Sequence, residues 1–461
     1  MKKKLAIVSS YFSEEAYGLL GPQLAATVIQ DHTEFDCIVV GVTNENDSKA
    51  LRWALQEYFG QQSPVIGFSL LSGREDLFLL AKELRRSGAQ TILGGPQSRS
   101  DYKGEVDRQR FPHRFKGLMD HFTCALAGPV EQIVPWLQKD EISNLDQNTT
   151  GLLFRQDGAI IENPSKAWNG KYLSRVRWDN LYRLKSGSFI PHRVQTAQVL
   201  QQIGCPHASR TRQVEIDFPT ALSNRRGEKI SIPTKGCTFC DVASDKGFCG
   251  SLDDETVIEQ IRCLPEDSRS RKIPFELINE NPLAGLPRLL RRLKAENVKI
   301  SQINLIMRAD WFLAGLTHLT AALRLAGEMG VRILMASMGF EAFDDTLLSN
   351  FNKGITVETN LEAIRQMRRL KELFPDTWLY SNREGAIHGF IHPTPWDSRK
   401  TAANTQKIFA LYGLLNDILP FHSTPLIIHH AAALGDWIRA VEVQENIQCK
   451  RYGSIIGWWD L

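Results

Sequence analysis

The sequence predicts an α/β protein built from two parallel-sheet domains. Short apolar runs rich in β-branched residues, such as KLAIVSSYF and FDCIVVGVT, alternate with helix-length segments such as REDLFLLAKELRRSG. This alternation stops in the middle of the chain and resumes near residue 228. Because parallel strands are buried on both faces and are joined by crossover helices, the pattern favours βα units in both halves.

The first domain is expected to span residues 1–138 and to form a Rossmann-like sheet. Its predicted strands are KLAIVSSYF, FDCIVVGVT, SPVIGFSLL and AQTILGGPQ. Residues 139–225 are more polar and richer in turn residues, and we interpret them as a linker or bridging segment. Within this segment, LLFRQDGAIIENPS predicts a hairpin that turns at Asp157-Gly158.

The second domain is expected to span residues 226–440 and to form a partial, TIM-like (β/α)6 barrel. Its predicted strands are EKISIPTKG, KIPFELINE, ISQINLIMR, VRILMASMGFE, AIHGFIHPT and PFHSTPLIIHH. Reactive groups of such barrels lie on the loops that follow the strands. Residues 441–461 end in the apolar run YGSIIGWWDL, which we expect to pack as a carboxy-terminal cap.

Composition limits the classes of function. The chain has 461 residues, of which 55 are basic and 52 acidic, so its net charge of +3 does not indicate a nucleic-acid partner. The apolar run at the amino terminus is too short for a signal peptide or a membrane span, so we expect a cytoplasmic protein with no membrane partner. Eight cysteines in a chain of this length do not suit a disulfide scaffold.

Three of the cysteines lie close together in SIPTKGCTFCDVASDKGFCG, directly after the first predicted barrel strand. They are Cys237, Cys240 and Cys249. Thiolates bind zinc or an iron–sulfur cluster, and three of them suit a cluster with one open iron better than a closed zinc site. Cys205 and Cys263 are each candidates for a fourth ligand. Packing or redox thiols are the remaining interpretation.

The residues around this motif resemble the radical S-adenosylmethionine superfamily. KGCTFCDVA, with an aromatic residue before its second cysteine, is similar to the cluster loop of that superfamily. FELINENPL, MRADWF, GFEAFDDTLLSNFNKGITVETNLEAI and GFIHPTPWDSRKTA continue the resemblance after successive strands. VIGFSLLSG, TILGGPQ and ALAGPVEQIV resemble the cobalamin-binding domain that some members carry.

The resemblance implies a [4Fe–4S] cluster on three thiolates, with S-adenosylmethionine on the open iron as the source of a 5′-deoxyadenosyl radical. The superfamily spacing is CxxxCxxC, but Pro233 stands where the first cysteine would fall, so Cys249 is the candidate third ligand. The implied chemistry is methyl transfer, or radical rearrangement or cyclisation, on a small-molecule or peptide substrate. An external electron donor such as flavodoxin or ferredoxin is the implied partner.

The resemblance also assigns an S-adenosylmethionine site at the strand ends. Glu280 and Asn281 occupy the loop that meets the methionine amine, and Glu341 is expected to bind the ribose hydroxyls. An acidic residue there would also stabilise the start of a helix. Arg308 and Asp310 are expected either to reach the methionine carboxylate or substrate, or to pair with each other.

The cobalamin assignment departs from the family pattern. Corrinoid domains that ligate cobalt use DxHxxG after the first strand, whereas this loop, SSYFSEEAYGLLGPQLA, has no histidine. His32 is interpreted as a surface residue, so either cobalamin binds without a histidine ligand or the domain has lost it. Ser69, Ser72, Gly94 and Gly95 would let a flat macrocycle approach the backbone, or they form tight turns that the fold needs.

Several histidines lie on or beyond the last two predicted strands, and no catalytic residue is assigned among them. His392 and His422 are expected in the cavity, whereas His429 and His430 are interpreted as core residues, and His388 is left without a role. The alternative to an enzyme is a non-catalytic zinc-binding or redox-thiol protein that uses the same cysteine loop.

Overall fold

A computed structural model describes residues 2–10, 18–70, 73–139, 145–240, 248–419 and 423–460. The chain divides into two compact units. The first unit comprises Met1–Ala197, Glu259–Pro265 and Arg451–Ile456, and the second comprises Gln198–Ile258, Glu266–Lys450 and Gly457–Leu461. Among the described residues, no helix is long and apolar enough to cross a membrane.

The first unit begins with alternating strands and helices. These elements are β1 (Lys3–Ser10), α1 (Leu20–His32), β2 (Phe35–Val42), α2 (Ser48–Phe59), β3 (Val65–Ser69), α3 (Glu75–Arg86), β4 (Gln90–Leu93), α4 (Ser98–Lys103), β5 (Cys124–Leu126) and α5 (Val134–Leu137). The four strands predicted from the sequence all form.

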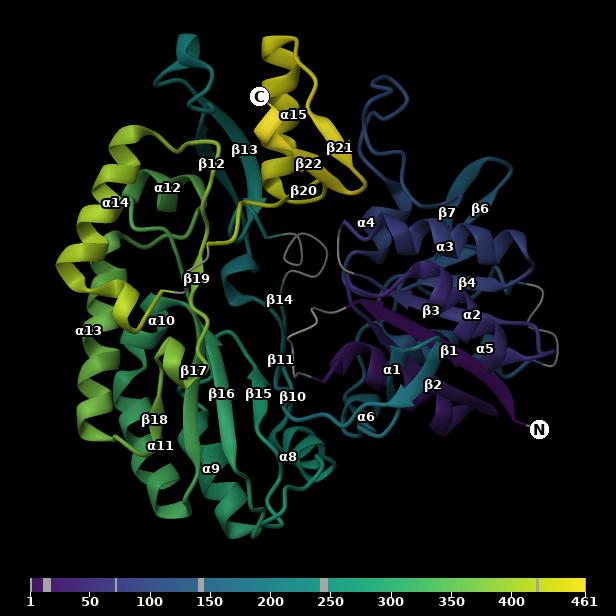
Figure 1. The fold of residues 1–461 in the computed structure, drawn as a ribbon, viewed down its shortest axis with the longest axis horizontal. Coiled ribbons are helices and arrows are strands. Elements are labelled where there is room, and N and C mark those ends of the chain that lie inside the picture. The colour runs from purple at the N-terminus through teal and green to yellow at the C-terminus, as the bar shows by residue number, and fades with distance from the viewer. Residues whose placement is uncertain are drawn as a thin grey trace. The chain divides into compact units, whose positions relative to one another are not determined.

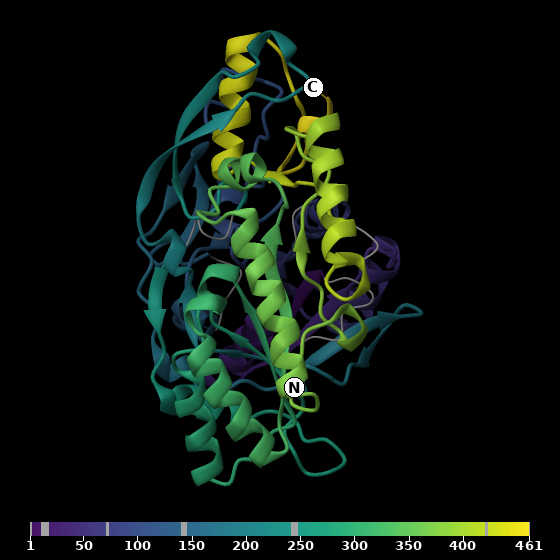
Figure 2. The same ribbon diagram turned by 90° about the vertical axis from the view of Figure 1, so that its left-hand side faces the viewer.

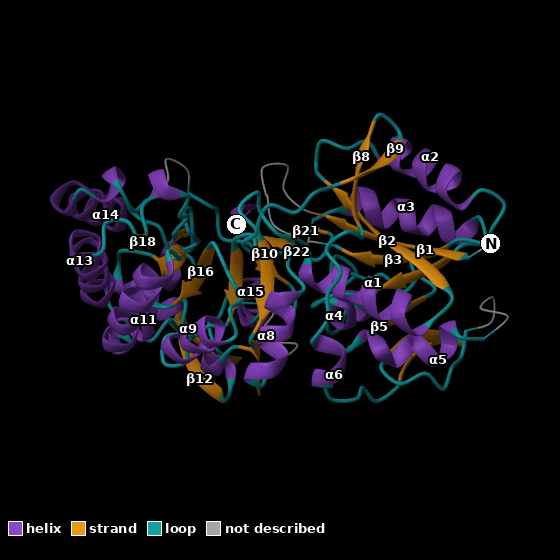
Figure 3. Cartoon of the chain, turned by 90° about the horizontal axis from the view of Figure 1, so that it is seen from below, coloured by secondary structure: helices purple, strands orange, loops and turns teal. Residues whose placement is uncertain are grey.

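Parallel pairing gives these strands the order β5-β4-β3-β1-β2, in which the direction of winding reverses between β1 and β3. Figure 3 shows α2 and α3 on one face of the sheet and α1 and α5 on the other. The strands are buried on both faces, and for this reason their sequences are continuously apolar. In such sheets ligands bind at the carboxyl ends of the strands beside the reversal point.

The segment interpreted as a linker extends this sheet at both edges. It contributes β6 (Leu152–Gln156), β7 (Ala159–Glu162), α6 (Gly170–Leu173), β8 (Leu181–Lys185) and β9 (Ser188–Pro191). The predicted hairpin is confirmed, because β6 and β7 pair antiparallel across Asp157 and Gly158. Both turn residues have positive φ, 50° and 82°, as a two-residue hairpin turn requires.

The second unit is built around a parallel sheet with helices along its outer side (Figures 1 and 2). The sheet has the order β10-β15-β16-β17-β18, and β19 also pairs with β17. Its strands are β10 (Ala197–Leu200), β15 (Phe275–Ile278), β16 (Gln302–Met307), β17 (Arg332–Glu341), β18 (Trp378–Leu379) and β19 (Gly389–Phe390). This arrangement and the first unit's Rossmann-like sheet confirm the predicted fold class, α/β with a partial barrel.

The other elements of this part of the chain connect or flank the sheet. The helices are α8 (Asp254–Arg262), α9 (Leu286–Ala295), α10 (Ala309–Ala314), α11 (Leu316–Met329), α12 (Asp345–Asn350), α13 (Val357–Leu373), α14 (Arg399–Tyr412) and α15 (Ala433–Glu445). The short strands are β11 (Gln202–Gly204), β12 (Thr211–Asp217), β13 (Lys229–Lys235), β14 (Phe248–Ser251), β20 (Ile428–His429), β21 (Lys450–Tyr452) and β22 (Ile455–Gly457).

Of the predicted barrel strands, one lies outside the parallel sheet and one joins its edge by a single bridge. The first, in EKISIPTKG, forms β13, which pairs antiparallel with β12 instead of with β15. Its residues alternate between exposed and buried, as expected of a ribbon with one face in solvent and not of a central barrel strand. The last, in PFHSTPLIIHH, pairs in parallel at Thr424 with Ile391, next to β19, and its later residues form β20 in a separate small sheet.

A buried ion pair within the first unit generates a prediction about stability. Glu105 is fully buried and accepts two hydrogen bonds from Arg451, at 3.0 and 2.9 Å, and one from the Phe115 N–H at 2.8 Å. Glu105→Gln would remove a negative charge that pairs with this buried guanidinium. We expect this change to lower the free energy of unfolding by about 3–5 kcal/mol in urea titrations.

The matched control for this prediction is the exposed pair between Arg52 and Glu83, whose atoms lie 3.2 Å apart. Solvent already screens this pair, so Glu83→Gln should cost less than about 1 kcal/mol. Equal effects of the two glutamine substitutions would contradict the importance of the buried pair.

Candidate functional site

The CxxC turn directly follows β13 and is fixed by the loop after α12. The Thr238 N–H donates to the Phe351 carbonyl at 3.0 Å, and the Thr238 hydroxyl donates to the Asn350 carbonyl at 2.8 Å. The rings of Phe239 and Phe351 meet edge to face, with centroids 5.3 Å apart. Cys237 and Cys240 are partly buried, and the Cys240 N–H donates to the Cys237 carbonyl at 3.2 Å. The two thiols are therefore presented on a rigid turn.

The third predicted ligand, Cys249, belongs to β14, but its side chain lies outside the described residues. The cysteines whose side chains are described form no disulfide. Pro233 lies within β13 opposite Gln213, so the position of the superfamily's first cysteine belongs to a strand here.

Two buried cations flank the Cys237 thiol. The Arg308 Nη1 atom lies 3.9 Å from the Cys237 Sγ atom, and Arg308 also donates to the Lys353 carbonyl. The Lys353 ammonium lies 3.0 Å from the Glu341 carboxylate, and these two side chains are only 3% and 14% exposed. The loops after β13, β16 and α12 thus bring two positive charges to one thiol.

The charges around this thiol shift several pKa values. Burial raises the pKa of Cys237, while Lys353 and Arg308 act in the opposite direction by favouring the thiolate. Burial alone would lower the pKa of Lys353, but the negative charges of Glu341 and Cys237 outweigh it and raise that pKa. The thiol therefore lies among two cations and the carboxylates that pair with them.

Glu341 combines an unusual backbone conformation with a tightly enclosed carboxylate. Its φ of 58° is in the left-handed region, which costs a residue other than glycine about 1–3 kcal/mol. A Cβ atom at Gly339 would lie 2.7 Å from one Glu341 carboxylate oxygen, and one at Gly389 would lie 2.6 Å from the other. Glu341 does not stabilise a helix start, because the N-cap of α12 is Asp344.

The predicted S-adenosylmethionine ligands Glu280 and Asn281 differ in burial. Glu280 is partly buried, and burial raises its pKa although Lys353 and Arg308 act to lower it, which shows that it faces the same charges. Asn281 is exposed, and its N–H donates to the Asn279 side chain at 2.8 Å.

Arg308 and Asp310 form the mutual ion pair that was one of the two expectations. The Arg308 Nε and Nη2 atoms lie 3.0 and 3.2 Å from the two carboxylate oxygens of Asp310.

Lys353 was not predicted from the sequence. The sequence feature that could have indicated it is the single lysine in NFNKGI, within the longest segment that resembles the family. A lysine is almost never buried without a partner, but only the structure shows that this one is buried.

In the first unit, the residues predicted to line the cobalamin crevice lie at the carboxyl ends of β3 and β4. The Gly94 N–H donates to the Phe68 carbonyl at 2.7 Å. Gly95 has a φ of 92°, and a Cβ atom there would lie 2.9 Å from the Ser69 hydroxyl, so the two loops approach closely. Ser72 lies outside the described residues.

His32 cannot face this crevice. It is the last residue of α1, a helix that starts after the carboxyl end of β1 and returns to the amino end of β2. The imidazole is exposed at the opposite edge of the sheet from the crevice, and its ring meets that of Tyr172 with centroids 5.2 Å apart.

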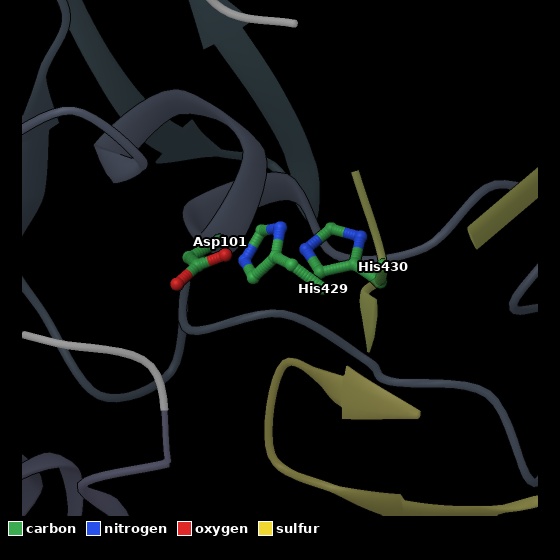
Figure 4. A group of neighbouring side chains, drawn as sticks. All are labelled: Asp101, His429 and His430. Carbon is green, nitrogen blue, oxygen red and sulfur yellow. The ribbon is translucent and has the colours of Figure 1, made fainter. Parts of the chain in front are cut away.

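Three of the late histidines are buried. His388 is buried, accepts a hydrogen bond from the Met338 N–H at 3.0 Å, and contacts the Tyr380 carbonyl at 2.7 Å. His429 and His430 are buried neighbours with ring centroids 4.6 Å apart, as expected of core residues (Figure 4). Asp101, also drawn there, is a residue of α4 in the first unit.

The two remaining histidines were predicted to lie in the cavity. His392 lies 3.0 Å from Asp397 and is half exposed. His422 lies outside the described residues.

Comparison with solved structures finds a protein of similar fold. The chain is similar to the structure of a radical S-adenosylmethionine methyltransferase, TsrM, from Kitasatospora setae, solved with cobalamin and a [4Fe–4S] cluster bound. The TM-score is 0.56 at 14% sequence identity, over 96% of this chain and 75% of that one. No family model matches the sequence, and no curated protein matches it.

The environment of His388 predicts a pH dependence of stability. Burial is the main cause that lowers its pKa to about 4, below the ordinary 6.5. The unfolded chain therefore binds this proton more tightly, and stability is lost as the pH falls from about 6.5 to 4, by about 3 kcal/mol from this group. Urea titrations of the wild type and His388→Gln across this range should show a flatter profile for the variant. Parallel profiles would contradict the assignment.

Proposed function

We propose that this chain is a radical S-adenosylmethionine enzyme that holds a [4Fe–4S] cluster on the CxxC turn after β13. The observation that carries the proposal is the pair of thiols at Cys237 and Cys240, with Arg308 and Lys353 beside the first of them. Soft thiol donors suit iron–sulfur ligation, and nearby cations favour the thiolate that a metal requires. The fold shared with the TsrM structure supports the same conclusion.

The proposal assigns a role to each of the side chains around the CxxC turn. Cys237, Cys240 and Cys249 are the cluster ligands, and the cluster would supply the electron that cleaves S-adenosylmethionine. Glu280 would accept a hydrogen bond from the methionine amine, and Asn281 would contribute backbone on the same loop.

Glu341 would bind the ribose hydroxyls, held in place by its ion pair with Lys353. Arg308 would meet the methionine carboxylate, and its pairing with Asp310 fixes the direction of the guanidinium. These two ion pairs orient side chains that must meet the nucleoside and amino-acid ends of the cofactor.

The first unit supplies the second cofactor site. Ser69, Gly94 and Gly95 would line the cobalamin site at the carboxyl ends of β3 and β4, where a doubly wound sheet binds ligands. Ser72, predicted from the sequence for the same site, lies outside the described residues. With both cofactors, methyl transfer to a small molecule or peptide is the proposed reaction, and radical rearrangement or cyclisation is the alternative within the class. An external flavodoxin or ferredoxin would deliver the electron.

The cluster assignment predicts the metal content of the protein. Anaerobically reconstituted wild type should contain about four iron and four sulfide per chain. Cys237→Ala, Cys240→Ala and Cys249→Ala should each lose the cluster, measured as iron, sulfide and visible absorption. The buried core cysteines provide matched controls that should keep it: Cys37→Ala, Cys124→Ala and Cys449→Ala.

Two results would contradict this assignment. Stoichiometric zinc without sulfide in oxygen-free protein would favour the zinc-binding alternative and reject the cluster. An intact cluster in Cys249→Ala would show that the third ligand lies elsewhere.

The crevice predicts cobalamin bound without a protein nitrogen on cobalt. Purified protein mixed with hydroxocobalamin should keep the corrinoid through gel filtration, because contact with the macrocycle and its tail provides the binding. Electron paramagnetic resonance of the cobalt(II) form should lack axial nitrogen splitting, and His32→Ala should not change it. Nitrogen splitting would contradict the geometry, and complete loss of the corrinoid would contradict the cofactor assignment.

A further inference from the structure

Cys205 follows β11 directly, and β11 pairs with the strand that carries Cys249. Gly204 is opposite Phe248 and Ile203 is opposite Gly250, so the register skips Cys249 between these two pairs. The end of β11 therefore brings Cys205 beside the strand of the proposed third ligand. Neither cysteine is near the other in sequence.

The segment after Cys205 packs against the CxxC turn. A Cβ atom at Gly236 would lie 3.2 Å from the Ala208 Cβ atom. The His207 Nε2 atom contacts the Asn352 carbonyl at 2.9 Å, and the Asn352 side-chain amide donates to the Gly236 carbonyl at 2.7 Å. Asn352 thus ties the short helix at Pro206–Ala208 to the residue that precedes Cys237.

The segment before Cys205 is fixed to the loop that carries Glu280. The Gln201 N–H donates to the Ile278 carbonyl at 3.1 Å, and the Asn279 side-chain amide donates to the Gln201 side chain at 2.8 Å. Residues 201–208 thus extend from a contact with the end of β15, at Gln201, to a contact with the CxxC turn, at Ala208. Burial, followed by the negative charges of Glu280 and Cys237, raises the pKa of the Cys205 thiol, consistent with a position between those groups.

We propose that Cys205 is a fourth thiol of the cluster site, which closes the open iron in the absence of S-adenosylmethionine and leaves it when S-adenosylmethionine binds. The inference rests on the proposed function. Its basis is the position of Cys205 between the CxxC turn and Glu280, the side chain assigned to the methionine amine. Cys205 therefore lies where the amino-acid end of S-adenosylmethionine would arrive.

Replacement of Cys205 by S-adenosylmethionine on the iron changes no oxidation state. The bond from iron to the Cys205 sulfur breaks, and bonds from iron to the methionine amine and carboxylate form. The methionine ammonium loses one proton when its nitrogen becomes a ligand, and the released Cys205 thiolate takes that proton.

The test compares anaerobically reconstituted full-length wild type, Cys205→Ala and Cys263→Ala, all without S-adenosylmethionine. After brief ferricyanide oxidation, electron paramagnetic resonance measures the three-iron cluster left when the least protected iron is lost. We expect equal iron and sulfide before oxidation, and a several-fold larger three-iron signal in Cys205→Ala than in wild type or Cys263→Ala. Equilibrium dialysis should show several-fold tighter S-adenosylmethionine binding to Cys205→Ala, because no thiol competes for the iron.

The outcomes separate this inference from the proposed function. Equal three-iron signals and equal S-adenosylmethionine affinity in all three proteins would overturn the role of Cys205. Loss of the cluster in Cys205→Ala would also overturn it, because Cys205 would then be an obligatory ligand. If Cys205→Ala does not fold, Cys205→Ser keeps the size of the side chain and takes its place. A wild type without iron and sulfide would instead overturn the proposed function.

Discussion

The buried ammonium of Lys353 is the constraint on which the second unit's site depends. It pairs with Glu341 at the end of β17, its own carbonyl accepts from Arg308 at the end of β16, and its charge acts on Cys237. Removing an ion from water costs several kcal/mol, which only well-placed partners offset. Each of these loops is therefore held in the position that keeps the lysine paired, and the thiol and the carboxylate are positioned together.

The same constraint explains the strained backbone of Glu341. A left-handed conformation persists in a residue other than glycine only where the surrounding structure determines it. Here Gly339 and Gly389 leave space for the carboxylate between two paired strands, and Lys353 holds one of its oxygens. A side chain at either glycine would occupy the place of that carboxylate. The close approach and the ion pair thus hold the Glu341 backbone in this conformation.

Much of the framework follows from periodicity, whereas the details of the site depend on tertiary packing. β1 to β4 and the Asp157-Gly158 hairpin are predictable because continuous apolar runs and turn residues are local signals. The assignment of β13 to the barrel was wrong because a strand's sequence does not show which strand it pairs with, and the partner, β12, lies in the segment interpreted as a linker.

Side-chain burial is equally hard to infer from sequence spacing. The sequence did not show that Lys353 and His388 are buried. Their burial is produced by segments that lie far from them in the sequence. The CxxC motif was visible, but the ion pairs around it join residues on different loops. A motif predicts which donors are present, and only the fold shows which charges surround them.

The pairing of β12 with β13 also accounts for the unusual spacing of the cysteines. In that ribbon Pro233 is a strand residue opposite Gln213, and the residues on either side of it are held by the same ladder. A thiol four residues before Cys237 would belong to a strand and not to a loop that can close around a metal. The remaining thiols must therefore come from other segments, and the β11–β14 pair brings both Cys205 and Cys249 to one strand end. A site assembled from separate segments forms only when those segments have folded, so the proposed function predicts that cluster binding and local folding are coupled.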